Sequence, residues 1–170
     1  HGLRPGSSAE ALVVAEAAGR FGARFTAIQI KVSPGPNLES RARTQRYEAL
    51  PDGVATGHTA EDQAETVLLA MLRGSAWAGL EPTERRPLLG LRRSDTEELC
   101  QILGLTPVDD PSNSDPVHRR NRVRHELLPL MASIAERDPV PVLGRQAELL
   151  RQGGDVLAKL AQALDPTDAR

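Results

Sequence analysis

The chain has 170 residues, of which 39% are hydrophobic, so it can bury the core of one large domain or of one domain with an appendage. It shows no run of about 18 apolar residues and no signal peptide, which indicates a cytoplasmic protein without a membrane partner, and its single cysteine excludes an internal disulfide. The formal net charge is −2 and 19 of the 21 basic residues are arginine, so any nucleic-acid surface must be local, while scarce aromatic residues exclude a base-stacking platform.

The first part of the chain predicts a helix followed by a strand. Ser7 and Glu10 form a capping box for a helix that ends near Ala18. Apolar and polar side chains then alternate over residues 25–32, which is typical of a β-strand. Because helix and strand alternate in α/β proteins, we also expect a strand before His1.

A second helix, expected over residues 37–50, carries a polar face. Glu39, Arg43 and Arg46 are spaced to lie on one side of it. One interpretation is a solvated flank held by the Glu39–Arg43 pair, and the other is a surface that faces a partner.

Residues 54–80 are the most informative stretch. A strand end and Gly57 precede a helix, and the glycine would let a ligand approach the backbone closely. Thr59 and Asp62 have the spacing of a capping box, which by itself would explain the acid at that position. The stretch therefore has a structural and a functional interpretation.

The functional interpretation depends on the helical wheel of this stretch. Asp62, Glu65 and Arg73 fall on one face, which we expect to look outward, and His58 lies one turn before the acids. The opposite, packed face is expected to consist of Ala64, Val67, Leu68, Met71 and Leu72. Capping does not account for the other charged side chains, so we predict a ligand site above the start of this helix.

Two joints are shorter than their neighbouring elements require. A helix must end and a strand must begin between Leu50 and Gly57, and the segment from Leu80 to Pro87 is similarly abrupt. We therefore expect loops to be missing from the chain near Leu50 and Leu80.

A short helix and a turn follow. Ser94 and Glu97 are spaced to cap the helix, which Gly104 ends. Its inward side chains are expected to be Leu99, Ile102 and Leu103. Residues 109–115 are rich in Asp, Pro, Ser and Asn and predict a loop.

A cationic run occupies residues 116–125, with four arginines, two histidines and no acid. Arg120 and Arg124 are neighbours on one helical face. The packed face of the same helix is expected to hold Val123, Leu127, Leu130 and Ile134. A run of one sign is often a solvated face, but in an acidic chain it favours a nearby anion such as phosphate or RNA.

The last part, from residue 140, predicts helices interrupted at Gly153–Gly154. They would form either a small helical hairpin or a linker helix toward a further domain. No chemistry is visible in this part of the sequence.

Several segments carry a family resemblance. The stretch TGHTAEDQAETVLLAMLRGSAWAGL resembles the GH-x-x-D-D-Q-x-E-T helix of the PP-loop ATP pyrophosphatase superfamily, with Glu61 in place of the first Asp. RRPLLGL, DPSN and HRRNRVRHELLPL follow in the order found in the tRNA(Ile)-lysidine synthetase family, and HGLRPGS and NLESRARTQRY match it near the start. The resemblance extends from His1 to about Met131.

The resemblance implies an α/β fold, a doubly wound parallel sheet followed by a helical segment. Residues 1–135 would be a PP-loop ATPase-like catalytic domain, and residues 140–170 linker helices toward a C-terminal tRNA-binding region. The family's SGGxDS loop, whose backbone cradles the pyrophosphate of ATP, is expected before His1. Residues 1–170 by themselves are therefore not expected to complete adenylation.

The resemblance also implies a ligase reaction of tRNA modification. ATP, with Mg²⁺, would adenylate the C2 carbonyl oxygen of the wobble cytidine in an isoleucine tRNA with a CAU anticodon. The amine of free L-lysine would then displace AMP and give lysidine. The sequence leaves a homodimer open and identifies no metal ligands.

The resemblance also assigns roles to residues. The expected catalytic residues are His58, Asp62 and Glu65, of which Asp62 and Glu65 would also bind the ammonium groups of lysine. The residues expected at the phosphates of ATP or tRNA are Arg73, Arg120, Asn121 and Arg124. The residues expected to face the tRNA are Glu39, Arg43 and Arg46.

Two other functions fit part of the sequence. A tRNA thiolation enzyme of the same superfamily would use cysteines near the site, whereas Cys100 stands alone on a predicted helix. A non-catalytic RNA-binding module would follow if the SGGxDS loop were absent from the gene product.

Overall fold

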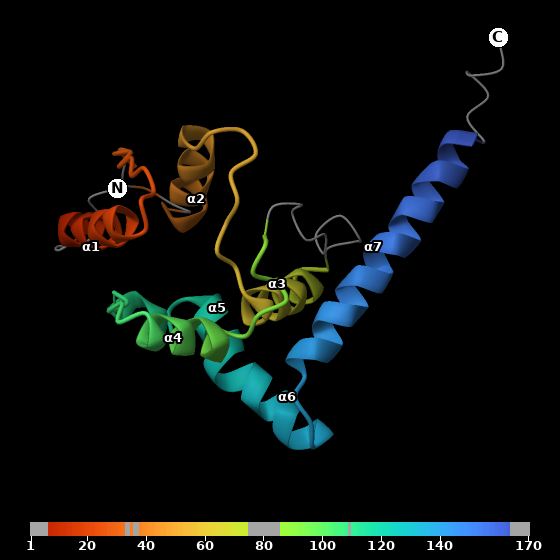
Figure 1. Ribbon diagram of the computed structural model, residues 1–170. Coiled ribbons are helices and arrows are strands. Elements are labelled where there is room, and N and C mark those ends of the chain that lie inside the picture. Colours follow the sequence, from red (N-terminus) through yellow and green to blue (C-terminus); the bar gives the residue numbers. More distant parts are fainter. Residues whose placement is uncertain (1–6, 33–34, 36–37, 75–85, 109, 164–170) are drawn as a thin grey trace, which may run out of the picture. The chain divides into compact units, whose positions relative to one another are not determined.

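The computed structural model describes residues 7–32, 35, 38–74, 86–108 and 110–163 (Figure 1). The chain divides into two compact units. Unit 1 comprises residues 1–54 and 97–109, and unit 2 comprises residues 55–96 and 110–170. Every predicted site residue between His58 and Arg124 belongs to unit 2, which therefore contains the candidate site.

The described ranges form helices joined by turns and irregular segments. Their helical elements are α1 (Ser7–Arg20), α2 (Leu38–Ala49), α3 (Ala60–Leu72), α4 (Arg93–Ile102), the 3₁₀ turn η2 (Pro111–Ser114), α5 (Arg119–Arg122), the π-helical turn η3 (Val123–Leu127), α6 (Leu128–Ala135) and α7 (Val140–Ala163). None of the helices in these ranges is both long enough and apolar enough to cross a membrane.

The predicted doubly wound parallel sheet is wrong for the part of the chain that the structure describes, because no residue there belongs to a strand. Residues 25–32, predicted as a strand, have no regular structure, and Phe25 and Ile28 stay exposed. Alternation of side chains favours extended backbone, but a strand also needs a partner for its N–H and C=O groups and cover for its apolar face. Residues 25–32 have neither in the described ranges.

Unit 1 contains the first two predicted helices. α1 ends two residues later than expected, where Gly22 has a φ of 66° and the Ala23 N–H donates to the Ala18 carbonyl at 2.8 Å. This is a glycine C-cap, in which the left-handed conformation costs a glycine little. α2 is confirmed, and the Arg43 guanidinium lies 5.2 Å from the centre of the Tyr47 ring.

The core of unit 2 is built around α3, which packs against α7, α5 and η3. Its buried apolar residues are Ala64, Val67, Leu68, Ala70, Val123, Leu128, Val140, Leu143 and Ala147. Helices in a unit of this size are held mainly by such tertiary packing, since their isolated stability in water is marginal. The start of α3 is therefore fixed in place by helices that come from later in the sequence.

The predicted packed face of α3 is only partly correct. Ala64, Val67 and Leu68 are buried as expected, whereas Met71 and Leu72 are exposed. An apolar position on a helix becomes core only where another element covers it, and the described part of the chain leaves the last turn of α3 open.

The predicted cap of α4 is wrong, and its predicted packed face is only partly correct. The Asp95 carboxylate accepts the Arg92 N–H at 2.7 Å, so capping comes from this pair and not from Ser94 and Glu97. Leu99 and Ile102 are exposed, whereas Leu103 is half-buried. The end of the helix is as predicted, because Gly104 has a φ of 61° just beyond it.

The cationic run forms a continuous helical segment through α5, η3 and α6. Val123 is buried and Leu127 partly buried, as predicted, but Leu130 and Ile134 are exposed. The prediction therefore holds for the first two turns of this segment, which lie against α3.

α7 is one helix of 24 residues that runs past α3 without a break (Figure 1). The predicted interruption at Gly153–Gly154 is wrong. A glycine inside a helix costs about 1 kcal/mol relative to alanine, which lowers stability without breaking a helix anchored by packing. Val140, Leu143 and Ala147 provide that anchor at its N-terminal end.

The first of the two short joints is bridged by a turn. The Val54 N–H donates to the Pro51 carbonyl at 3.2 Å, and Gly53 has a φ of 74°. The loop expected to be missing near Leu50 stays a prediction. The second joint, near Leu80, lies outside the described residues.

Candidate active site at the start of α3

The capping box at the start of α3 is confirmed. The Thr59 N–H donates to Asp62 Oδ2 at 2.9 Å, and the Thr59 hydroxyl donates to the same oxygen at 3.1 Å. The next N–H, that of Ala60, donates to the Leu91 carbonyl at 2.9 Å. Asp62 is therefore held by its own helix, and that helix start is tied to the segment before α4.

Glu65 lies one turn further along α3 and is completely buried, with 0% of its surface exposed. Its Oε2 accepts Arg120 Nε at 2.5 Å, and its Oε1 accepts Arg124 Nε at 2.6 Å. Arg124 also donates from Nη2 to Oε2 at 3.1 Å. The predicted outward-facing position of Glu65 is therefore wrong, because the cationic helix covers this face of α3.

Asp62 joins the same group of charges. Its Oδ1 accepts Arg120 Nη2 at 3.0 Å, and the guanidinium groups of Arg93 and Arg124 each lie 3.6 Å from that oxygen. Burial by itself would raise the pKa of Asp62, but the Thr59 backbone hydrogen bond and the charges of Arg120 and Arg93 outweigh it and lower that pKa. Asp62 is thus a carboxylate at neutral pH.

Glu61 extends the group to α4 and to the loop before α7. It accepts Arg92 Nε at 2.6 Å and the Arg93 N–H at 2.9 Å, and Arg92 also pairs with Asp138. Burial would raise the pKa of Glu61, but these hydrogen bonds, with the charge of Arg92, lower it. Glu61, where the family motif has Asp, therefore joins three segments of unit 2.

We call this group the acid–arginine cluster. Its members are Glu61, Asp62, Glu65, Asp138, Arg92, Arg93, Arg120 and Arg124. The sequence missed Arg92, Arg93 and Asp138, which lie far from α3 in the chain. Pairs of charged residues usually belong to solvated surfaces, so no local signal distinguishes these residues.

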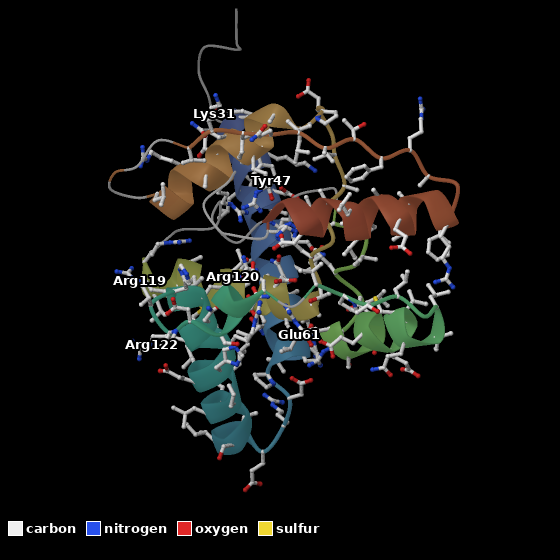
Figure 2. The ribbon with its side chains drawn as sticks, turned by 90° about the vertical axis from the view of Figure 1, so that its left-hand side faces the viewer. Lys31, Tyr47, Glu61, Arg119, Arg120 and Arg122 are labelled. Atoms are coloured by element: carbon white, nitrogen blue, oxygen red, sulfur yellow. The ribbon has the colours of Figure 1, made fainter. Side chains whose placement is uncertain are left out.

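The arginines of the cationic run divide into two sets. Arg120 and Arg124 bind Glu65 of α3. Arg119 and Arg122 lie on the left-hand side of the molecule in Figure 2, away from Glu61. Arg122 pairs with Glu126 at 2.8 Å on its own helix. The i, i+4 spacing of the inner pair correctly predicted that its members share a face.

Arg73 is not part of the acid–arginine cluster. It lines a groove of about 490 Å³ between the end of α3 and the cationic helix. The groove residues are Leu69, Leu72, Arg73, Arg119, Arg122, Val123, Glu126, Leu127 and Leu130. Of the predicted phosphate residues, Arg120 and Arg124 thus lie in the cluster, Arg73 lies in the groove, and Asn121 lies in neither.

Asn121 and His58 each have a hydrogen-bonding partner close by in the chain. Asn121 is buried, and its Nδ2 donates to the Asp115 carbonyl at 2.8 Å, which fixes the loop before the cationic helix. His58 Nδ1 lies 2.7 Å from the Thr56 hydroxyl. Of the residues predicted to face tRNA, Arg43 and Arg46 lie on α2 in unit 1, and the Glu39 side chain is outside the described residues.

The cluster combines acids that can receive an ammonium group with guanidinium groups that can receive phosphate. Within the described ranges, no group of three or more His, Cys, Asp or Glu side chains is placed to hold a metal ion. The phosphates of a nucleotide are themselves ligands for Mg²⁺. The described side chains of the cluster can therefore bind a ligand through their charges and hydrogen bonds.

The sequence matches the PP-loop domain family over residues 1–131. It is also similar to proteins named tRNA(Ile)-lysidine synthase, with 43% identity over 176 residues to that of Rhodococcus erythropolis and 42% over 176 residues to that of Nocardia farcinica. The Mycobacterium tuberculosis protein of the same name is 42% identical over 178 residues. Each comparison covers 96% of the chain. The chain spans about half the length of these relatives, namely 54%, 55% and 54% in the order given. The resemblance stated from the sequence is confirmed.

Proposed function

The chain belongs to the PP-loop domain family, and from this premise we propose that it serves ATP-dependent ligation of lysine to C2 of the wobble cytidine in an isoleucine tRNA with a CAU anticodon. Support comes from the name shared by the relatives above. The observation that carries the proposal is the acid–arginine cluster, because this reaction must accommodate an ammonium group and several phosphates in one place.

In the first proposed step, O2 of the cytidine attacks the α-phosphorus of ATP and pyrophosphate leaves. Negative charge grows on the leaving pyrophosphate, and cationic hydrogen-bond donors stabilise such charge most effectively where water is excluded. Arg120 and Arg124 are the candidates, since their side chains are only 28% and 18% exposed. Mg²⁺ would accompany ATP as the counter-ion of its phosphates.

In the second proposed step, the amine of lysine attacks C2, AMP leaves, and the amine loses a proton. Asp62 is the proposed partner of the amine. An efficient general base has a pKa near the working pH, whereas the pKa of Asp62 is lowered. Asp62 therefore suits the binding of an ammonium group better than the removal of its proton. We therefore assign Asp62 first to binding and orienting lysine, with the proton passing from the amine to water as AMP departs.

Other residues have proposed roles at the edges of this site. We place His58 near the nucleotide and Arg73 at an RNA phosphate beside the groove, while Asn121 ties the helix of Arg120 to the loop before it. Arg43 and Arg46, with Glu39, are proposed to face the tRNA. We also propose residues 1–135 as the catalytic part and residues 140–170 as the connection to a tRNA-binding region.

The decisive experiment measures AMP release by the full-length natural protein. We expect AMP to form only when ATP, L-lysine and an isoleucine tRNA with a CAU anticodon are all present, with lysine found on the tRNA by mass spectrometry. A tRNA with a different anticodon and a reaction without lysine are the controls. AMP release that does not require lysine, or transfer of sulfur instead of lysine, would overturn the proposal.

A further inference from the structure

Glu65 was expected to bind lysine, but its surroundings support a different role. We infer that Glu65 is a positioning residue that orients Arg120 and Arg124 toward an anionic group, and that it does not contact lysine. The inference rests on the proposed function for the identity of the anion, which is a phosphate group of ATP or the pyrophosphate released from it.

The first argument is that Glu65 is inaccessible. Its side chain is 0% exposed, and each carboxylate oxygen accepts a hydrogen bond of 2.6 Å or less from a guanidinium Nε. A lysine ammonium group would have to displace a paired guanidinium from a buried acid. Arg124 binds both oxygens at once, and such a fork is held more strongly than a single-point ammonium contact.

The second argument is the contrast with Asp62, which retains 15% exposure and lies at the helix start. Its Oδ2 is used by the capping box, and its Oδ1 has one close partner, Arg120 Nη2 at 3.0 Å. The guanidinium groups of Arg93 and Arg124 stand further off, at 3.6 Å. Asp62 is therefore the acid of this pair that an incoming ammonium group can reach.

The third argument concerns what Glu65 holds in place. Arg120 uses Nε and Nη2, and Arg124 uses Nε and Nη2, so each planar guanidinium is fixed by two of its nitrogens. For both side chains Nη1 has no hydrogen bond to another described residue. Two like charges this close would separate without an acid between them, so Glu65 holds both guanidinium groups in place and leaves their Nη1 groups for an anion.

The experiment compares Glu65→Gln with Glu148→Gln in the full-length protein. Glu148 is the control, because it also pairs with an arginine, Arg151, but its side chain is 44% exposed and lies outside both the acid–arginine cluster and the groove. Binding of inorganic pyrophosphate is measured by calorimetry, and KM for ATP and for lysine by AMP release. We expect Glu65→Gln to weaken pyrophosphate binding and raise KM for ATP by about tenfold or more, as loss of a charge-assisted contact would. KM for lysine and all values of the control should stay within about twofold.

Two outcomes would overturn the inference. One is a raised KM for lysine with unchanged pyrophosphate binding, and the other is a wild-type protein that binds no pyrophosphate. If Glu65→Gln does not fold, Glu65→Asp keeps the charge but withdraws it by one methylene, and the same split between ATP and lysine is expected. Since pyrophosphate binding needs neither tRNA nor lysine, it tests Glu65 even if the proposed ligation fails.

Discussion

At the scale of single residues, two acids one turn apart on α3 differ in almost every physical respect. Asp62 caps its own helix and stays partly exposed, whereas Glu65 is buried between two arginines. A buried carboxylate is tolerated only when its charge is paired and its oxygens are hydrogen-bonded, and Glu65 meets both conditions. Position on the same helical face therefore does not imply the same role.

The Asp62→Asn variant tests the role of the exposed acid. An asparagine keeps an oxygen for the Thr59 N–H, so we expect a stability loss of only about 1–2 kcal/mol, from the weakened contact with Arg120. Lysine-dependent AMP release should fall by about a hundredfold or more, because the ammonium partner is lost. Chemical denaturation and the AMP assay measure the two effects, and activity close to wild type would refute the assignment.

The Glu61→Gln variant tests whether this acid holds the structure together. Glu61 is only 17% exposed and binds both Arg92 and the Arg93 backbone, so we expect a loss of about 1–3 kcal/mol in the free energy of unfolding. Glu148→Gln is the control, since Glu148 and Arg151 form an exposed pair on α7 that should contribute nothing measurable. Equal effects of the two variants in urea unfolding would contradict the structural role of Glu61.

At the scale of elements, the helices are specified by caps and glycines, but their partners come from elsewhere in the chain. α3 has its capping box and α4 ends at Gly104, both of which can be read locally. The burial of α3, in contrast, depends on α5, η3 and α7. α7 shows the limit of local signals, because the helix continues through Gly153–Gly154, where the glycines predicted a break.

Two glycine variants test this view of the helices. Gly144 lies inside α7 with open space where a Cβ would be, so Gly144→Ala should stabilise the protein by about 0.5–1 kcal/mol. Gly104 has a left-handed φ of 61° at the end of α4, so Gly104→Ala should destabilise it by about 1 kcal/mol. Thermal unfolding of both variants measures the signs, and two shifts in the same direction would refute the argument.

At the scale of the whole molecule, charge is concentrated although the net charge is only −2. In unit 2, the acid–arginine cluster joins α3, the segment before α4, the cationic helix and the loop before α7. Such a cluster holds these segments together only while its acids are ionised. The stability of unit 2 is therefore coupled to pH.

The pH dependence has a definite sign. The pKa values of Glu61, Asp62 and Asp138 are lowered in the folded protein, for Asp138 because its hydrogen bonds and the charge of Arg92 outweigh the opposing effect of burial. Acids with a lowered folded pKa bind fewer protons when folded, so their stabilisation is complete above the unfolded values near 4 and is lost as the pH falls through the folded values.

We therefore expect the thermal midpoint to stay level from about pH 7 to pH 5 and to fall below about pH 4. Asp62→Asn should reduce that fall, because one of the three acids no longer titrates. Calorimetry or circular dichroism across this range measures both. A midpoint that rises on acidification, or an identical slope in the variant, would contradict the coupling.

The sequence by itself determined the helix boundaries that depend on local chemistry and the site residues that lie within its motifs. The Thr59–Asp62 spacing, the glycine after α4 and the i, i+4 spacing of Arg120 and Arg124 all act within a few residues, so they can be read from the chain. The motif order likewise identified the family.

Only the tertiary structure decided what those residues contact. The strand predicted at residues 25–32 failed because pairing needs a distant partner, and Met71 and Leu72 failed as core because burial needs a covering element. Arg92, Arg93 and Asp138 joined the cluster across 31 or more positions in the chain. Glu65, which was predicted to be exposed, is buried for the same reason, because residues of α5 and η3 cover it only once the chain has folded.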